Sequence, residues 1–244
     1  MSVQKWGKTM YAYEINAGYS AMDESFRMKI TSILDCFQDA ATFEAENGTI
    51  NTEYLYQRNI VWLLSSWQIV INRRPGMNEH IKITTSPYDF KGFFGYRNFT
   101  IESADGEIMV KAASIWSLID TKTLTPARPT QELKDGYPLS EKLAMDYAPR
   151  KIAILGEGVE QEPFPVRKYQ IDSNKHVNNV EYVKMALEFV DCPDEIGELR
   201  VEYKKAAHFG DLVAPVVCIC DKITQVRLQD TQGGIFAVVE FHFR

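Results

Sequence analysis

Two periodicities of apolar side chains alternate along the chain, and their order predicts the elements of its first half. Residues 28–45 have apolar side chains at helical spacing, at Ile30, Ile33, Leu34, Phe37, Ala40 and Ala41. An extended run over 10–18 precedes this helix, and strand-like segments follow it near 60–72, 80–86, 93–103 and 107–119. The turn residues 103–106 predict a hairpin between the last two strands. The first half therefore predicts a strand, a long helix and a run of antiparallel strands.

The second half repeats this order. Residues 164–172 predict an extended segment, and a helix from about Asn179 then places Val180, Val183, Leu187 and Val190 on one face. Strands are expected near 196–206, 212–224 and 234–243. A long apolar helix buries itself best against one curled antiparallel sheet. Each half therefore predicts an α+β hotdog unit, and the whole chain a double (tandem) hotdog.

The segment between the two halves has the composition of a linker. Residues 121–163 contain Pro126, Pro129, Pro138 and Pro149, together with three glycines, and they predict one short helix near 139–146. We therefore assign residues 1–125 to an N-terminal hotdog, 126–160 to a linker and 161–244 to a C-terminal hotdog.

Composition and charge narrow the function. The formal net charge of −6 argues against broad nucleic-acid binding, although it leaves room for a local basic patch. No stretch reaches the length of a membrane span, and the first residues lack a signal or transit pattern. We therefore expect a soluble, cytoplasmic protein with no nucleic-acid or membrane partner. The spacing of the four cysteines (36, 192, 218 and 220) does not suit a metal site, so we expect reduced core cysteines, no metal and no cofactor.

A dense group of polar side chains lies where the second helix starts: Asp172, Asn174, His176, Asn178 and Asn179. Helix capping needs one such residue, or two if Glu181 reaches back from the first turn to form a capping box with Asn178. The group is therefore larger than capping requires. Asp172 and His176 are the two members able to take a proton from water at neutral pH. Backbone N–H groups near 177–180 carry the positive end of the helix dipole and are suited to polarise a carbonyl.

The stretch from Asp172 to Tyr182, Asp-x-Asn-x-His-Val-Asn-Asn-x-x-Tyr, resembles the signature of the acyl-acyl-carrier-protein thioesterases of fatty-acid synthesis. Residues 59–75, 96–129 and 199–211 are similar to further segments of that family, in the same order. The resemblance implies hydrolysis of the thioester of acyl-acyl carrier protein, which releases a free fatty acid and terminates chain elongation. Its implied partner is acyl carrier protein bearing acyl-phosphopantetheine.

The same resemblance implies roles for the polar group. His176 and Asn174 would act on the attacking water while Asp172 orients or assists, whereas in coenzyme A hotdog relatives the carboxylate has the main role. The sequence leaves both assignments open, with Asn178 and Asn179 in support. Where the family has Glu-Cys, this chain has Ala206-Ala207, so a cysteine nucleophile is excluded there. His208 either replaces the lost glutamate in part or is simply a histidine at the end of a strand.

An acyl chain needs an apolar tunnel, and an acidic carrier protein needs cations. The first half offers these candidates for the tunnel, which suit a plain core equally well: Ile33, Phe37, Trp62 and Trp116. The basic residues that could dock the carrier are Arg73, Arg74, Arg200, Lys204 and Lys205.

Three other functions stay open from the sequence. An acyl-coenzyme A thioesterase shares the same chemistry. A non-catalytic acyl-binding or regulatory hotdog is suggested by Ala206-Ala207. An acyl hydratase or dehydratase is the third, although the polar group does not specifically imply it. The sequence defines neither the preferred acyl chain length nor the oligomeric state, a homodimer included.

Overall fold

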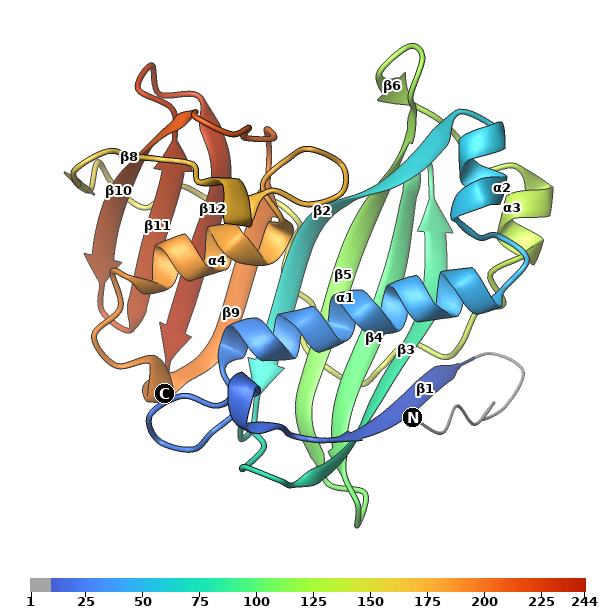
Figure 1. Cartoon of the computed structure of the whole chain (residues 1–244), viewed down its shortest axis with the longest axis horizontal. Coiled ribbons are helices and arrows are strands. Elements are labelled where there is room, and N and C mark those ends of the chain that lie inside the picture. The colour runs from blue at the N-terminus through green and yellow to red at the C-terminus, as the bar shows by residue number, and fades with distance from the viewer. Residues whose placement is uncertain (1–9) are drawn as a thin grey trace. The chain divides into compact units, whose positions relative to one another are not determined.

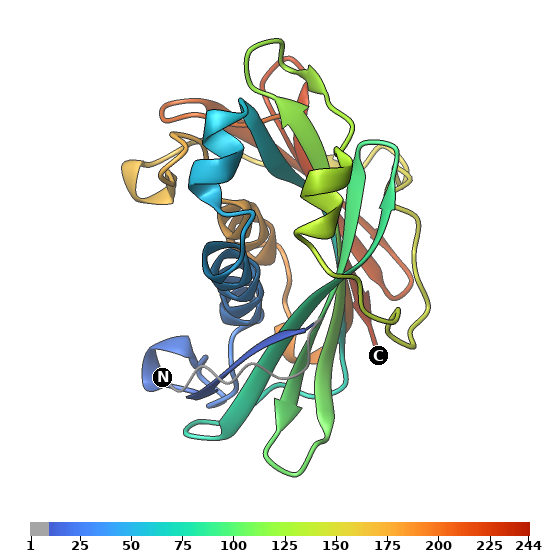
Figure 2. The ribbon, with the colours of Figure 1, turned by 90° about the vertical axis from the view of Figure 1, so that its right-hand side faces the viewer.

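The computed structural model describes residues 10–244, which form two compact units (Figure 1). Among the described residues, the first unit comprises 10–64 and 71–147, and the second comprises Ser65–Val70 and Ala148–Arg244. In each unit a helix lies across one face of an antiparallel sheet, as both views show (Figures 1 and 2). The first nine residues of the predicted N-terminal hotdog lie outside the described range.

The first unit contains most of the elements predicted for the first half. Their bounds are β1 Tyr11–Asn16, a 3-10 turn Tyr19–Ala21, α1 Ile30–Asn47, α2 Thr52–Gln57, β2 Ile60–Ile71, β3 His80–Lys91, β4 Phe94–Ser103, β5 Ile108–Asp120, β6 Thr125–Pro126 and α3 Gln131–Asp135. The strands β1, β3, β4 and β5 are neighbours in that order, and β6 pairs with β5. The predicted long helix is therefore confirmed as α1.

The core of the first unit is built on α1. Ile33, Leu34 and Phe37 are fully buried, as their helical spacing predicts. The ring centroids of Phe37 and Phe99 are 5.1 Å apart, which joins the helix to β4. On the side of β1, the hydroxyl of Tyr13 donates to the backbone carbonyl of Cys36 at 3.0 Å. Ile33 and Phe37 are therefore core residues of this unit.

The second unit has the same plan with shorter elements. Their bounds are β7 Val159–Glu160, β8 Phe164–Pro165, a 3-10 turn Lys168–Gln170, α4 Asn179–Leu187, a 3-10 turn Pro193–Glu195, β9 Ile196–Tyr203, β10 Leu212–Cys220, β11 Ile223–Gln229 and β12 Ile235–Phe243. The strand order is β9, β12, β11, β10 and β7, while residues 66–70 of β2 pair with β9 and β8 pairs with β10. The helix α4 packs against β11 and β12 (Figure 1).

Three local predictions are wrong. The single strand expected over 212–224 is two strands, because Asp221 takes a positive φ of 48° and turns the chain between β10 and β11. Residues 164–172 do not form one extended run, because the strand at Phe164–Pro165 is followed by a 3-10 turn at Lys168–Gln170. The short helix expected near 139–146 lies instead at Gln131–Asp135, where Thr130 caps it by accepting the N–H of Leu133 at 3.2 Å.

The cysteine prediction holds in part. All four thiols are free, but Cys36 is the buried one, whereas Cys192 and Cys220 are exposed and Cys218 is half-buried. Burial raises the pKa of the Cys36 thiol to about 11. Within residues 10–244, no helix combines the length and the apolar character that crossing a membrane requires.

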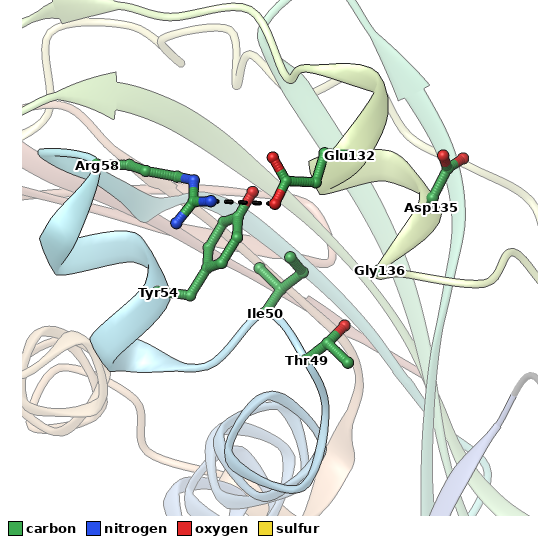
Figure 3. Close-up of a pocket in the computed structure, with 7 residues that line it drawn as sticks. All are labelled: Thr49, Ile50, Tyr54, Arg58, Glu132, Asp135 and Gly136. Carbon is green, nitrogen blue, oxygen red and sulfur yellow. Dashed lines mark hydrogen bonds and ion pairs between the residues drawn. The ribbon is translucent and has the colours of Figure 1, made fainter.

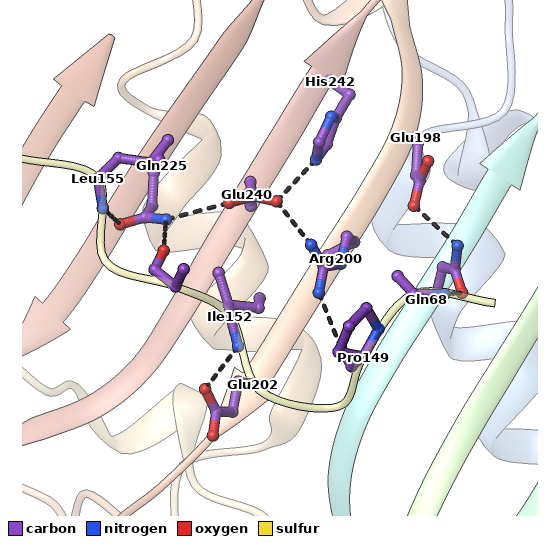
Figure 4. Close-up of polar contacts among 12 residues, drawn as sticks. Gln68, Pro149, Ile152, Leu155, Glu198, Arg200, Glu202, Gln225, Glu240 and His242 are labelled. Carbon is purple, nitrogen blue, oxygen red and sulfur yellow. Dashed lines mark hydrogen bonds and ion pairs between the residues drawn. The ribbon is translucent and has the colours of Figure 1, made fainter. Parts of the chain in front are cut away.

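Part of the predicted linker runs along the sheet of the second unit, on a face lined by polar side chains (Figure 4). Glu202 accepts the N–H of Ile152 at 3.0 Å, and Gln225 accepts the N–H of Leu155 at 3.0 Å. Arg200 donates to the carbonyl of Pro149 at 2.8 Å and pairs with Glu240 at 3.0 Å. Because Glu202, Gln225 and Glu240 are buried, their partners are needed to offset lost hydration. The linker backbone therefore provides partners for Glu202 and Gln225, and Arg200 provides one for Glu240.

We predict that Gly136→Ala destabilises the first unit by about 1–3 kcal/mol, the usual range for overpacking. A Cβ at Gly136 would lie 2.1 Å from Cγ1 of the buried Ile50, so that side chain or the end of α3 must move. Gly18→Ala is the matched control, because its Cβ would meet nothing within 4 Å and its φ of −80° suits alanine. Urea unfolding measures both changes, and equal midpoints for the two variants would contradict the prediction.

Candidate functional site

The residues Asp172 to His176 form a tight loop that is closed by an isolated bridge between Ile171 and Val177. The Asp172 N–H donates to the carbonyl of His176 at 2.8 Å. The Oδ1 atom of Asp172 accepts the N–H of Asn174 at 2.8 Å and that of His176 at 3.4 Å. An aspartate favours this turn because its side chain can hydrogen-bond the backbone two residues on. The carboxylate thus shapes the loop with one oxygen, and Oδ2 has no partner among the contacts of the described residues.

The helix α4 begins directly after this loop. Asn178 is its N-cap, with its Oδ1 accepting the N–H of Val180 at 2.9 Å. The N–H of Val177 donates to Ala207 and that of Asn178 to Gln170, both at 2.9 Å. Of the four N–H groups at 177–180, that of Asn179 alone lacks a partner within the described part of the chain. It therefore offers a free donor at the positive end of the helix dipole.

Within the described residues, Asn178 and Glu181 do not form a capping box, because the Asn178 N–H donates to Gln170. The Glu181 carboxylate accepts instead from Lys184 on the next turn. The cap at the start of α4 is therefore a single side chain, that of Asn178. The side chain of Asn179 makes no hydrogen bond within residues 10–244, while its carbonyl accepts the hydroxyl of Tyr203 at 3.0 Å.

Two histidines meet beside the loop. The ring centroids of His176 and His208 are 4.8 Å apart in an edge-to-face arrangement. The Nδ1 atom of His208 lies 3.7 Å from Oδ2 of Asp211, which also accepts the His208 N–H at 2.9 Å. The structure thus brings His208 to the predicted site and adds Asp211, which the sequence reasoning missed. The Asn174 side chain is exposed and contacts no group of the described chain through a hydrogen bond.

Tyr182 is a second group that the sequence reasoning missed, although it closes the quoted stretch. Its buried hydroxyl accepts the N–H of Ala207 at 2.8 Å and so ties the segment after β9 to α4. Burial raises the pKa of Tyr182 to about 12, and the charges of Asp211 and Asp172 act in the same direction. The hydroxyl is therefore protonated at neutral pH and keeps its proton available to an acceptor.

The basic residues predicted to dock a carrier differ in their surroundings. Arg73 pairs with Glu79 and Glu107 at 2.8 and 2.7 Å. Arg200 is held in the network of Figure 4. These two side chains therefore have partners within their own units.

The remaining three basic residues are divided by burial. Arg74 is buried, with 8% of its side chain exposed, and pairs with Asp23. Lys204 and Lys205 are more exposed, although Lys205 lies 3.0 Å from Asp230 and Lys204 lies 3.5 Å from Glu202. Lys205 is therefore the most exposed member of the set, with 58% of its side chain exposed.

The tunnel candidates form two groups in the first unit, and Trp62 and Trp116 belong to one group because both lie beside Gly95. Trp62 packs against a buried cluster of Ile50, Leu118, Leu133 and Tyr137 and lies 6.1 Å from Phe90 between ring centroids. The half-buried Trp116 donates from Nε1 to the hydroxyl of Ser114 at 2.7 Å. Ile33 and Phe37 are in the α1 core described above.

A cavity of about 620 Å³ opens beside the Trp62 cluster and has a charged rim (Figure 3). The residues that line it are Thr49, Ile50, Tyr54, Arg58, Glu132, Asp135 and Gly136. Arg58 lies 3.5 Å above the Tyr54 ring and pairs with Glu132 at 3.0 Å. None of the predicted tunnel residues lines this cavity.

Comparison with known proteins settles the family. The family model for the acyl-ACP thioesterase N-terminal domain matches residues 7–137, and the model for the C-terminal domain of the same family matches residues 156–234. The chain belongs to the acyl-ACP thioesterase family. The predicted resemblance is thereby confirmed, and it covers both units.

Curated relatives support this membership at low identity. The chain is similar to a chloroplastic acyl-acyl-carrier-protein hydrolase of Cuphea viscosissima, at 26% identity over 85% of this chain and 53% of the relative. It is also similar to a chloroplastic palmitoyl-acyl carrier protein thioesterase of Gossypium hirsutum, at 22% identity over 88% of this chain and 54% of the relative. The chain thus spans about half the length of these relatives.

Solved structures establish the fold. An acyl-ACP thioesterase from Bacteroides thetaiotaomicron matches with a TM-score of 0.88 at 20% identity, over 96% of this chain and 98% of the other. A 12:0-ACP thioesterase from Umbellularia californica matches with a TM-score of 0.85 at 15% identity, over 99% of both chains. The predicted α+β tandem hotdog is therefore confirmed.

We predict that Arg74→Met destabilises the first unit by about 3–5 kcal/mol at pH 7, because it leaves the Asp23 carboxylate without its cation. Burial alone would raise the pKa of Asp23, but the Arg27 and Ser25 N–H groups and Arg74 together hold it below its usual value of 3.8. The stability from the pair is therefore present above pH 3.8 and is lost as the pH falls through the lower folded-state value. Urea unfolding across this range measures the effect, and a deficit that does not shrink in acid would contradict it.

Proposed function

We propose that this chain hydrolyses the thioester of acyl-acyl carrier protein, releases a free fatty acid and so terminates chain elongation. One arrangement carries the proposal: a carboxylate oxygen of Asp172 and the imidazole of His176 lie on one loop, shortly before the N–H of Asn179, which has no partner within the described part of the chain. Membership of the acyl-ACP thioesterase family supports the same reading. So do the names of the relatives, which are hydrolases or thioesterases of acyl carrier protein.

The proposed reaction needs a water, a base and a donor to the carbonyl oxygen. Asp172 or His176 takes a proton from water as its oxygen attacks the thioester carbon. The N–H of Asn179 donates to the oxygen on which negative charge develops. The carbon–sulfur bond then breaks, the thiolate leaves with the proton taken up by the base, and the acid is released.

The loop geometry suits Asp172 to the part of base. Its Oδ1 is oriented by the N–H of Asn174, so Oδ2 is presented in a fixed direction without a competing partner within residues 10–244. His176 contacts His208 rather than the carboxylate, and it is the second candidate. In this proposal Asn174 acts mainly through its backbone, while its exposed side chain is free to contact a substrate or water.

Water attacks directly in this proposal, without a covalent cysteine intermediate. Ala207 stands where the family has cysteine, and it is fully buried. The buried thiol of Cys36 has a raised pKa, which disfavours the reactive thiolate. In this proposal the general base of the second unit, Asp172 or His176, therefore activates the water.

The partner is acyl carrier protein with its acyl-phosphopantetheine. For docking we keep Lys204 and Lys205, whose side chains are 37% and 58% exposed. Those of Arg74 and Arg200 are only 8% and 15% exposed, and Arg73 is held between two carboxylates. For the acyl chain we propose an apolar compartment in the first unit near Trp62 and Trp116, since Ile33 and Phe37 are fully buried in the core.

We predict faster hydrolysis of acyl chains offered on carrier protein than on coenzyme A, and a preference that weakens as salt rises. An acidic carrier is attracted by screened charge, whereas the thioester chemistry is common to both. Lys205→Gln should reduce the carrier preference, and Lys91→Gln, an exposed lysine of the first unit, is the control. Release of free fatty acid across a panel of chain lengths measures the rates. Equal rates on both carriers without a salt effect would favour the coenzyme A alternative, and no release from either would favour a non-catalytic acyl-binding protein.

We predict that Asp172→Asn and His176→Ala each lower kcat by about 10²–10⁴, the usual loss on removal of a general base or its partner. Folding should change little, because asparagine keeps the oxygen that accepts the loop N–H groups and neither change opens a core cavity. Steady-state kinetics on acyl carrier protein measure the effect.

Asn178→Ala is the control for the helix start. Loss of this cap should cost about 1 kcal/mol of stability and little rate. Full turnover in both the Asp172 and His176 variants would show that the polar group is structural.

A further inference from the structure

The site loop has a counterpart in the first unit. There an isolated bridge joins Met22 to Met28, and the Asp23 N–H donates to the carbonyl of Arg27 at 2.9 Å. The Oδ1 atom of Asp23 accepts the N–H of Ser25 at 3.0 Å and that of Arg27 at 3.1 Å. This is the hydrogen-bond pattern that Asp172 makes with Asn174 and His176 in the second unit.

The backbone conformation matches as well. Phe26 has a φ of 55°, and Lys175, three residues after Asp172, has a φ of 64°. Each loop is followed directly by the helix of its unit, α1 or α4. Asp23 is therefore the counterpart of Asp172, and Arg27 that of His176.

The strand that lies against each loop repeats too. The N–H groups of Asn72 and Arg73 both donate to the carbonyl of Met109, as those of Lys204 and Lys205 both donate to Phe236. Two residues beyond Arg73, Pro75 accepts the N–H of Met28.

In the second unit, Ala207 accepts the N–H of Val177 in the same way. Pro75 is thus matched by Ala207, which places Arg74 opposite Ala206. The side chains at these two positions differ in charge and size: Arg74 has a buried guanidinium, whereas Ala206 has only a methyl group.

Arg74 engages the first loop at two points. Its guanidinium pairs with Oδ2 of Asp23 and lies 3.3 Å from the carbonyl oxygen of Met28. The side chains of Arg74 and Asp23 are 8% and 21% exposed, so the pair is largely shielded from water. The atom it occupies, Oδ2, is the one that Asp172 leaves without a partner in the described part of the second unit. A carboxylate held in this way has no free oxygen to accept a proton from water.

We propose that Ala206 determines the availability of the Asp172 carboxylate, and that the first loop is its silenced counterpart, closed by Arg74. The proposal deepens the proposed function, on which it rests. Ala206 acts by leaving space beside the carboxylate, so it is a positioning residue. In the first unit the same loop contributes stability through the Asp23–Arg74 pair.

The test is Ala206→Arg, which places the side chain of Arg74 in the second unit. The matched backbone predicts that the new guanidinium reaches Oδ2 of Asp172. We expect kcat on acyl carrier protein to fall about 100-fold or more, as for loss of a general base. Ala206→Met is the control for bulk, and its loss should be far smaller. Equal losses in the two variants, or full activity in Ala206→Arg, would overturn the proposal.

A thermal readout separates this proposal from the proposed function. If the new pair forms, the Tm of Ala206→Arg should exceed that of Ala206→Met by about 2–4 °C at neutral pH. The increment should vanish when Asp172→Asn is added to both, because the coupling depends on the carboxylate. An increment that survives Asp172→Asn would overturn the pairing. A wild-type chain that hydrolyses no thioester would instead refute the proposed function, while the thermal cycle would still report on the pair.

Discussion

The bond from the Asn174 N–H to Oδ1 of Asp172 is the contact on which the site depends. It shapes the loop that leads into α4 and leaves the second carboxylate oxygen without a partner among the described residues. The side chain of the N-cap Asn178 then accepts the N–H of Val180. The carbonyls of Ala207 and Gln170 accept the N–H groups of Val177 and Asn178. The way the loop satisfies its own backbone thus leaves two groups without a partner among residues 10–244: the acceptor Oδ2 of Asp172 and the N–H donor of Asn179.

The same loop does different work in the two units. In the first unit, Arg74 pairs with the Asp23 carboxylate, and the loop leads into α1, an eighteen-residue helix that packs in an apolar core. In the second, α4 is nine residues long and its loop is flanked by His208, Asp211 and Tyr182. One backbone pattern therefore serves as a structural ion pair in one place and as a candidate catalytic group in the other. The side chain opposite the carboxylate makes the difference.

The periodicity of side chains carried enough information for α1, the strands β2 to β5 and the start of α4, because burial on one face dictates the spacing. Periodicity did not predict the elements whose limits are set by a backbone turn or a helix cap. The turn at Asp221 interrupts a run that reads as one strand, and the cap at Thr130 draws the short helix away from 139–146. The candidate site could be predicted only in part. Asp172 and His176 stand out by residue type and position. The partner of Arg74, and the placement of His208 with its neighbour Asp211 beside His176, depend on contacts between distant segments. Free and engaged arginines look alike in a sequence.

In the proposed reaction the second unit activates water directly, and no covalent acyl–protein intermediate forms. Mass spectrometry of the intact chain during a single turnover of acyl carrier protein, stopped by acid at successive times, tests it most directly. The account predicts free fatty acid that accumulates while the chain keeps its unmodified mass throughout. An acyl adduct on any side chain that appears before the free fatty acid, and decays as the fatty acid forms, would contradict it.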